Sequence, residues 1–329
     1  MKVLVTGGTG FVGRELVKML VSEGYDVRCT SRQPDDLSAI AELMIGDIRD
    51  LAFLNHCCKG CEAVFHLASK VGVWGKYSDF YSTNVDATKL LIDACNGNNV
   101  SYFIYASSAS VVFGGEDIEN GNESILYPAH QLSNYTITKA LAEKYIIQSN
   151  GNNIKTISLR PHLIWGPTDR HIIPGILKNA QTGKLVRISY YNKLVDTTYI
   201  DNFIDALKLS LLGLMNNPMV AGNCYFITNG EPIKIWDFIN RILDVYGYAS
   251  ITKSVPRSLA LGVVGLQEMF YKYFLPNQNI QTTRMVIKEL CQAHWFDISK
   301  AVKVLGYKPK ISIDDGFERL KKFKTQLIS

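Results

Sequence analysis

A tyrosine and a lysine stand four residues apart in the segment SNYTITK, residues 133–139. The segment has a helical pattern, so Tyr135 and Lys139 are expected on one helix face, about one turn apart. Free tyrosine ionises at a pH of about 10, and a neighbouring ammonium group favours the phenolate. Such a pair could serve as a general acid or base near neutral pH. An exposed helix with one aromatic and one basic residue would show the same spacing, so the alternative stays open at this point.

A glycine-rich segment, TGGTGFVG, directly follows the first apolar run of the chain and leads into a helical pattern. Glycines at this spacing allow a tight turn, a close approach of the backbone to a pyrophosphate, and close packing of the helix on the strand. The N–H groups and the dipole at the helix N-terminus favour the phosphates. An ordinary glycine-rich turn is the alternative. The expected dinucleotide-binding residues are Gly7, Gly10, Phe11, Val12 and Gly13.

The end of the second apolar run bears on which dinucleotide binds. An NAD site usually carries an acidic residue about 20 residues beyond the glycines, whereas an arginine suits the 2′-phosphate of NADP. Ser31 and Arg32 occupy this place, and the acidic residues Asp35 and Asp36 come later. We therefore expect NADP(H) in preference to NAD(H); a solvated loop position for Arg32 is the alternative.

Short apolar runs alternate with helical patterns through the first two thirds of the chain. Runs that are apolar on both faces and alternate with helices indicate a parallel sheet with helices on both sides. The expected fold class is α/β, with a doubly wound parallel sheet of the Rossmann type. The runs cover residues 2–6, 26–30, 43–47, 63–68, 102–107, 155–160 and 224–228.

The second part of the chain is richer in loops, prolines and glycines. We expect an NAD(P)-binding domain of residues 1–165 with about 198–229, and a smaller, interleaved substrate-binding lobe of residues 166–197 and 230–329. The apolar stretch 258–275 is interrupted by polar residues and too short for a membrane span, which needs about 20 mostly apolar residues. It is expected to be a substrate lid or an interfacial membrane contact.

Composition and charge argue against several classes of protein. With 47% hydrophobic and 20% charged residues, the chain has the composition of a soluble globular protein. From Lys300 onward there are eight basic and three acidic residues, and residues 1–299 hold 27 of each sign, so the formal charge of +5 belongs to the C-terminal segment. A solvated final helix accounts for this excess. Because no basic patch interleaved with aromatic residues accompanies it, nucleic-acid binding is not expected.

Seven cysteines raise the question of a metal site or disulfides. Cys57, Cys58 and Cys61 lie close in sequence, but no second cysteine or histidine pair follows at ligand spacing. Reduced structural thiols and no metal site are therefore expected. The chain enters a strand pattern at once, without a charged leader and apolar segment, so a cytoplasmic location is expected.

Several motifs, in this order, resemble those of the extended short-chain dehydrogenase/reductase family. They are TGGTGFVG, GDIRD, HLAS, YASSASVVFGG, the Tyr135 and Lys139 pair, and LRPHLIWGP, and the segment FDISKAVKVLGYKPKISIDDGF resembles the family's C-terminal region. Among the 17 tyrosines only Tyr135 has a lysine four residues on. The stretches SSASVVFGGEDIENG and YFITNGEPIKIWDFINRIL resemble the 3β-hydroxysteroid dehydrogenase branch, in particular bacterial 2-alkyl-3-oxoalkanoate reductases and sterol-4-carboxylate 3-dehydrogenases.

This resemblance implies roles for individual residues. Tyr135 would exchange a proton with the substrate oxygen, and Lys139 would bind the nicotinamide ribose and lower the pKa of Tyr135. Ser108 would hydrogen-bond the same substrate oxygen, with Ser107 as the alternative. The other implied cofactor contacts are Asp47 and Ile48 at the adenine, Ala68 at the adenosine ribose, and Pro161 and His162 at the nicotinamide end. Packing alone is the alternative for Ile48, Ala68 and Asn84, and a structural role is the alternative to substrate contact for His162 and His171.

The resemblance implies reversible hydride transfer between the nicotinamide and a carbinol or ketone carbon of a small apolar substrate. A 2-alkyl-3-oxoalkanoate is expected first and a 3β-hydroxysteroid or sterol second. A nucleotide-sugar epimerase or dehydratase and a non-catalytic NADP(H)-sensing protein are further alternatives. A homodimer through a helix pair that includes the Tyr135 helix is also implied. The segment RISYYNKLVDTTY departs from the family's glycine-rich turn, so Tyr190 and Tyr191 leave the shape of the acyl pocket open.

Overall fold

The computed structural model describes the whole chain except residues 189–190, 276–277, 279, 281 and 329. Its main sheet has seven strands in the order β12-β7-β5-β4-β1-β2-β3, and every neighbouring pair is parallel. The expected α/β fold class, a Rossmann-type parallel sheet, is confirmed. The strands are β1 (Lys2–Thr6), β2 (Asp26–Ser31), β3 (Glu42–Ile45), β4 (Ala63–His66), β5 (Tyr102–Ala106), β7 (Lys155–Pro161) and β12 (Asn223–Ile227).

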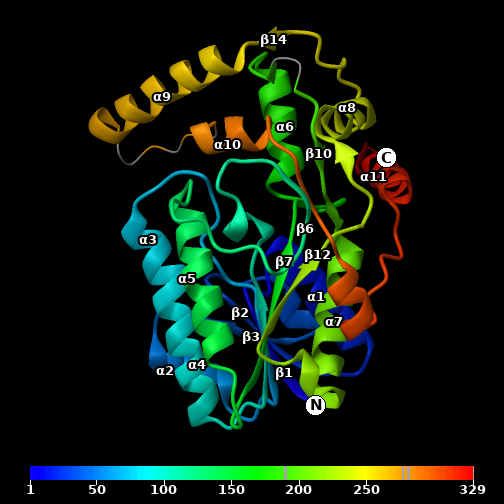
Figure 1. The fold of residues 1–329 in the computed structure, drawn as a ribbon. Helices are drawn as coiled ribbons and strands as arrows, with labels where there is room; N and C mark the ends of the chain where they lie inside the picture. Colours follow the sequence, from blue (N-terminus) through cyan, green and yellow to red (C-terminus); the bar gives the residue numbers. More distant parts are fainter. Residues whose placement is uncertain (189–190, 276–277, 279, 281, 329) are drawn as a thin grey trace.

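Helices cover both faces of this sheet (Figure 1). On one face α1 (Phe11–Ser22) contacts α7 (Ile200–Asn216), and on the other α4 (Ala87–Gly97) packs between α2 (Leu51–Cys58) and α5 (Asn134–Gln148). A short helix, α3 (Tyr77–Tyr81), continues into α4 through the π-helical turn η2 (Ser82–Asp86). Two separate clusters of apolar side chains fill the two interfaces.

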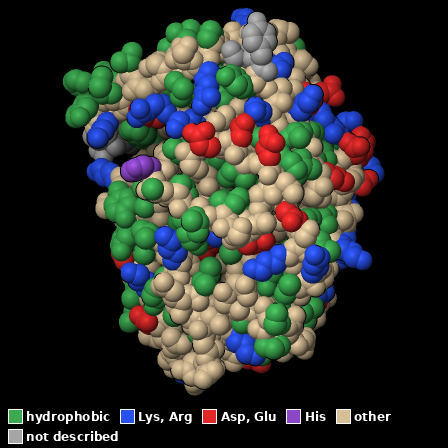
Figure 2. Space-filling view, viewed as in Figure 1, with side chains coloured by type: hydrophobic (Ala, Val, Ile, Leu, Met, Phe, Trp, Pro, Cys, Tyr) green, Lys and Arg blue, Asp and Glu red, His purple; other side chains and the backbone are tan. Residues whose placement is uncertain are grey.

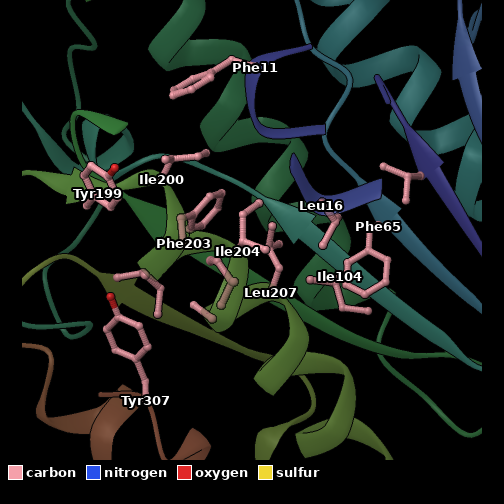
Figure 3. Packing of buried hydrophobic residues seen from close by; sticks show 14 of the residues in the cluster. Phe11, Leu16, Phe65, Ile104, Tyr199, Ile200, Phe203, Ile204, Leu207 and Tyr307 are labelled. Carbon is pink, nitrogen blue, oxygen red and sulfur yellow. The ribbon is translucent and has the colours of Figure 1, made fainter. Parts of the chain in front are cut away.

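Successive side chains of each strand point to opposite faces of the sheet and pack against the helices on that face. Figure 3 shows Leu16 of α1 near Phe65 and Ile104 from β4 and β5, with Ile204 and Leu207 of α7 in the same cluster. All five are at most 6% exposed. The first helix and the late helix α7 are thereby held on the same face of the sheet.

A second region, built from later chain, contains a four-stranded sheet in the order β13-β10-β15-β6. Figure 1 shows most of its helices grouped at one end of the main sheet. Its core includes Val195, Trp236 and Leu243. Its elements are β6 (Ile118–Gly121), α6 (Ile172–Gln181), β10 (Leu194–Val195), β13 (Ile233–Lys234), α8 (Ile235–Val245), α9 (Arg257–Phe274), α10 (Arg284–Glu289), β15 (His294–Phe296) and α11 (Ile313–Ile328).

The two regions are interleaved along the chain. Strand β6 lies within residues 1–165, yet it pairs with β15 of the second region. Two further parallel pairs join β8 to β11 and β9 to β14. The domain boundaries given above stay a prediction. The remaining elements are β8 (Ile164–Trp165), β9 (Arg187–Ile188), β11 (Thr198–Tyr199), β14 (Ser254–Val255), η1 (Asp36–Ala39), η3 (Ala109–Val112), η4 (Pro218–Val220) and η5 (Ala301–Leu305).

The cysteines are unbonded thiols, six of them buried. Cys58 Sγ and Cys95 Sγ lie 3.9 Å apart between α2 and α4, too far for a disulfide. Burial raises the pKa of the Cys57 thiol to about 12, so it is an inert packing group. Within the described ranges no cluster of metal-ligating side chains occurs, and none of the helices described is long and apolar enough to cross a membrane.

Candidate active site

The glycine-rich segment forms the turn between β1 and α1. Gly7 has a φ of +71°, and its N–H donates to Thr30 Oγ1 at 3.2 Å. A Cβ on Gly13 would come within 2.1 Å of Gly7 O, so the turn requires glycine there. No side chain caps the N-terminus of α1, which leaves its first N–H groups available to an anion. These features fit the pyrophosphate of a dinucleotide.

We expect Gly13→Ala to weaken dinucleotide binding by about tenfold or more, which corresponds to ~1.4 kcal/mol. The added methyl group would displace the Gly7 carbonyl and open the turn that is expected to hold the phosphates. Isothermal titration with NADPH and NADH measures the effect. Gly262→Ala is the matched control, since its Cβ would meet nothing within 4 Å in a helix. Unchanged affinity in the Gly13 variant would contradict the assignment.

At the end of β2 lie a hydroxyl and an exposed arginine. Ser31 Oγ lies 3.2 Å from Thr9 Oγ1 of the glycine turn, and the Arg32 side chain is exposed. Arg14 Nη2 donates to both carboxylate oxygens of Asp35 at 2.7 Å, and its Nη1 donates to Asp36. The two acidic residues that follow β2 are therefore already paired with α1.

The other predicted cofactor contacts lie around the same edge of the sheet, or pack within it. Ala68 lies so close to Gly7 that a Cβ added to Gly7 would come within 2.9 Å of the Cα of Ala68. Asp47 is paired with Arg49, whose guanidinium lowers the pKa of the carboxyl. Ile48 packs against the apolar cluster under α2 and α4. Asn84 accepts from Lys70 N at 2.7 Å and donates to Thr138 Oγ1 on α5, which is the packing role named as its alternative.

The first turn of α5 places Tyr135. Ser133 caps the helix by accepting from the N–H of Thr136, and the Thr136 hydroxyl accepts from the N–H of Ser133. This capping box fixes where the helix begins and so on which face Tyr135 lies. Burial raises the pKa of Tyr135 to about 12, although a hydrogen bond with Ser108 lowers it. The structure therefore brings the predicted Ser108 and Tyr135 together.

The two candidate serines differ in what they face. Ser108 lies beside Tyr135, and its Oγ is 2.8 Å from Ser110 Oγ. Ser107 is 5% exposed and helps to lower the pKa of the Glu143 carboxyl. Of the two, Ser108 is the one placed next to the Tyr135 hydroxyl.

Lys139 lies one turn beyond Tyr135 and is 2% exposed. Its Nζ donates to Ala106 O at 2.5 Å and lies 4.2 Å from the centroid of the Tyr105 ring. Burial lowers the pKa of Lys139 to about 7, against a smaller raising effect of Glu143. The expected lowering of the pKa of Tyr135 by Lys139 is not seen here, because burial of Tyr135 dominates and the amine points to Ala106.

A buried ion pair lies next to Lys139 on the same helix. Glu143 is 0% and Arg160 2% exposed. Arg160 Nη2 donates to Glu143 Oε1 at 2.7 Å, and the hydroxyls of Tyr127 and Ser158 donate to the same carboxylate at 2.7 Å. These partners outweigh the effect of burial and lower the pKa of Glu143. A fixed negative charge therefore sits one helical turn beyond Lys139.

The whole chain can now be compared with known proteins. The model of the 3-beta hydroxysteroid dehydrogenase/isomerase family matches residues 4–257. A 2-alkyl-3-oxoalkanoate reductase of Shewanella oneidensis is 37% identical, over 96% of this chain and 84% of that protein. The chain belongs to this family. A second 2-alkyl-3-oxoalkanoate reductase, of Stenotrophomonas maltophilia, is 33% identical over 98% of both chains.

Membership of the family makes the chain an enzyme, a nicotinamide-dependent oxidoreductase of hydroxyl and keto groups in the extended short-chain dehydrogenase/reductase group. A mouse sterol-4-alpha-carboxylate 3-dehydrogenase, decarboxylating, is 32% identical over 97% of this chain and 89% of that protein. Among solved structures, a UDP-glucose 4-epimerase of Thermotoga maritima aligns over 100% of both chains with a TM-score of 0.78 at 20% identity. That likeness shows the fold alone.

In this family member a histidine pair connects the two regions at the end of β7. His162 Nε2 lies 2.6 Å from His294 Nδ1, and His294 Nε2 donates to Glu289 O at 2.9 Å. Burial lowers the pKa of both imidazoles, so they are neutral. His162 follows Pro161 at the strand end and is 7% exposed, and the nicotinamide contact of the two residues stays a prediction. His171 is exposed beside α6. Tyr190 lies outside the described residues.

Glu289 is a site residue that sequence reasoning missed. It ends α10 and is only partly exposed, and burial raises the pKa of its carboxyl to about 7. Its negative charge raises the pKa of Tyr135, although the two residues are far apart in sequence. In the sequence Glu289 is an ordinary charged residue of a short helix, and no local pattern indicates that it lies near Tyr135.

Glu289→Gln is expected to shift the pH profile of alcohol oxidation to lower pH. Above a pH of about 7 Glu289 is charged, which disfavours the phenolate of Tyr135, so its neutralisation lowers the pKa of Tyr135. The measurement is kcat/KM for oxidation against pH. Glu268→Gln on α9, whose carboxylate pairs with Arg284, is the control. An identical profile in the Glu289 variant would contradict this coupling.

Proposed function

We propose that the enzyme is a reductase of 2-alkyl-3-oxoalkanoates that uses NADP(H). Two relatives of that name align over nearly the whole chain. The observation that carries the proposal is the grouping of Ser108, Tyr135 and Lys139 where β5 ends and α5 begins. The apolar core of the second region is in keeping with an apolar substrate.

A bound nicotinamide supplies or takes up the hydride. In the proposed reduction, Tyr135 donates its phenolic proton to the ketone oxygen, which becomes the new hydroxyl, while Ser108 hydrogen-bonds that oxygen. Lys139 is proposed to bind the nicotinamide ribose, and its charge stabilises the phenolate left on Tyr135. Glu143 favours the charged form of Lys139, which offsets part of the cost of burying the amine.

Sterols are the second candidate substrate class. Several relatives named as sterol-4-alpha-carboxylate 3-dehydrogenases align over most of the chain at 31–32% identity. Both classes present a 3-oxo or 3-hydroxy centre next to a carbon that carries a carboxylate. The epimerase alternative has support from the fold only, and the non-catalytic alternative conflicts with membership of a family of named enzymes.

The deciding experiment measures NADPH oxidation by the purified enzyme with a long-chain 2-alkyl-3-oxo acid and, in parallel, with a 3-oxosteroid. Turnover of the oxo acid with little turnover of the steroid is expected. The opposite ranking would transfer the assignment to sterols, and no turnover of either substrate would overturn both.

Arg32→Ala is expected to weaken NADPH binding by about tenfold, or ~1.4 kcal/mol, and to leave NADH binding unchanged. The exposed guanidinium at the end of β2 is the proposed partner of the 2′-phosphate, and the nearby Asp35 is already paired with Arg14. Titration with both dinucleotides measures the change. Lys303→Ala removes an exposed positive charge elsewhere and is the control. Equal losses for NADPH and NADH would argue against this role.

The homodimer through α5 also stays a proposal. Light scattering at micromolar concentration would give twice the chain mass of 36.8 kDa if it is right, and the chain mass itself if it is wrong. The cytoplasmic location stays a prediction.

A further inference from the structure

Helix α9 carries two apolar faces, and only one of them is covered. Ala260 and Val264 face inward and are 8% and 6% exposed, in the core of the second region. The other face presents large apolar side chains to solvent at helical spacing. They are Leu259 (55% exposed), Val263 (56%), Leu266 (65%), Met269 (54%), Phe270 (50%), Tyr273 (70%) and Phe274 (71%).

This outer face is contiguous and stands out from the body of the protein. Figure 1 shows α9 lying along the end of the second region, and Figure 2 shows apolar side chains projecting there, with lysine and arginine side chains nearby. Phe270 and Phe274 stack with ring centroids 5.1 Å apart. Single exposed apolar residues are ordinary, but a grouped set of this size marks an interaction surface.

The charges around α9 are mostly positive. Residues 251–289, through the end of α10, contain five basic residues and two acidic residues, Glu268 and Glu289. Glu268 is 13% exposed and is held by Arg284 through two hydrogen bonds at 2.7 Å, and Glu289 is partly buried and acts on Tyr135. Lys253, four residues before the helix, and Lys272 in its last turn are both exposed. A large apolar face bordered by basic residues is the pattern of a helix that lies in the interface of an anionic bilayer.

We propose that the outer face of α9 docks the enzyme on an anionic lipid surface, with the apolar side chains among the acyl chains and the lysines at the headgroups. This inference concerns binding to lipid alone and does not depend on which substrate the enzyme reduces. It favours the interfacial contact over the lid for residues 258–275, because the large apolar side chains are turned to solvent.

A second copy of the chain is a poorer partner for this face. In a two-fold contact between antiparallel α9 helices, Lys272 of one copy would approach Arg257 of the other, so like charges would meet. No acidic residue of α9 is free to offset them, because Glu268 is the helix's single acidic residue and is paired with Arg284. Anionic headgroups supply the missing negative charge.

The test is co-sedimentation of the full-length enzyme with vesicles. Vesicles of phosphatidylglycerol and phosphatidylcholine in equal parts are compared with vesicles of phosphatidylcholine alone. We expect several-fold more enzyme bound to the anionic vesicles at low salt, and a loss of this excess at high salt. The variant Leu266→Ser/Phe270→Ser/Phe274→Ser should lose binding to both. The variant Lys253→Glu/Lys272→Glu should lose only the preference for anionic vesicles.

A control variant and additional measurements distinguish loss of lipid binding from misfolding and from self-association. The control Leu126→Ser/Met219→Ser removes two large side chains that are 84% and 73% exposed elsewhere, and should bind vesicles like the unchanged enzyme. Circular dichroism and dinucleotide binding should be the same in all variants. Equal binding of the α9 serine variant and the control would overturn the proposal. A fall in mass by light scattering in the serine variant, with unchanged vesicle binding, would instead assign the face to a second copy.

Discussion

Tyr135→Phe is expected to lower kcat for ketone reduction by about 10²- to 10⁴-fold, the usual contribution of a positioned general acid. The variant keeps the ring packed in its half-buried place and removes only the hydroxyl, which lies next to Ser108. Steady-state kinetics with NADPH and the best ketone substrate measures the loss. Circular dichroism should show an unchanged fold, since one hydroxyl is removed and no cavity is made.

Tyr145→Phe provides the matched control, because it removes the same atom from the same helix, nearly three turns further on. There the ring packs against the apolar cluster under α2 and α4. Its kcat should stay within about twofold of the unchanged enzyme, because it takes no part in proton transfer. If Tyr135→Phe behaved like this control, another group would have to protonate the substrate oxygen, and the proposed mechanism would be wrong.

Glu143→Ala is expected to reduce the free energy of unfolding by about 3–5 kcal/mol, the usual cost of removing one partner of a buried ion pair. Arg160 is 2% exposed and would keep its charge without the carboxylate that holds it. The same change removes the negative charge that favours protonated Lys139, so the pKa of Lys139 should fall below its present value of about 7. As the pH rises, the variant should therefore lose the charge of Lys139, and with it activity, at a lower pH than the unchanged enzyme does.

Urea unfolding measures the first effect and the pH profile of kcat the second. Glu318→Ala is the control for stability, since its partner Lys321 is exposed and such pairs contribute at most about 1 kcal/mol. The double variant Glu143→Leu/Arg160→Met should recover much of the lost stability, because no charge is left unpaired. The double variant should not recover the pH profile of kcat, because Lys139 still lacks the nearby negative charge. Recovery of both the stability and the pH profile would show that Glu143 does not influence the pKa of Lys139.

Local sequence patterns were sufficient to predict the sheet and its glycine turn. The strand runs lie within a few residues of the observed strands, because a strand buried on both faces leaves a continuous apolar run in the sequence. Gly7 and Gly13 could be identified because turn geometry excludes side chains there. Tyr135 and Lys139 were found because a helix brings residues four apart onto one face.

Features that depend on contacts between distant segments could not be predicted in this way. The proximity of Glu289 to Tyr135 depends on how α10 packs over the end of the main sheet. The pairing of Arg160 with Glu143 depends on how β7 packs against α5, which the local sequence does not report. The pKa of Tyr135 differed from expectation because burial, which no spacing reports, outweighs its polar neighbours.

The position of β12 at the edge of the main sheet has a consequence for how the chain folds during synthesis. Asn223 pairs with Ile157, so β7 remains an open edge strand until the ribosome has made more than two thirds of the protein. An unpaired, apolar edge is prone to associate with other chains. The main sheet therefore cannot be completed until the whole segment between β7 and β12 has been synthesised, so its last strand joins late.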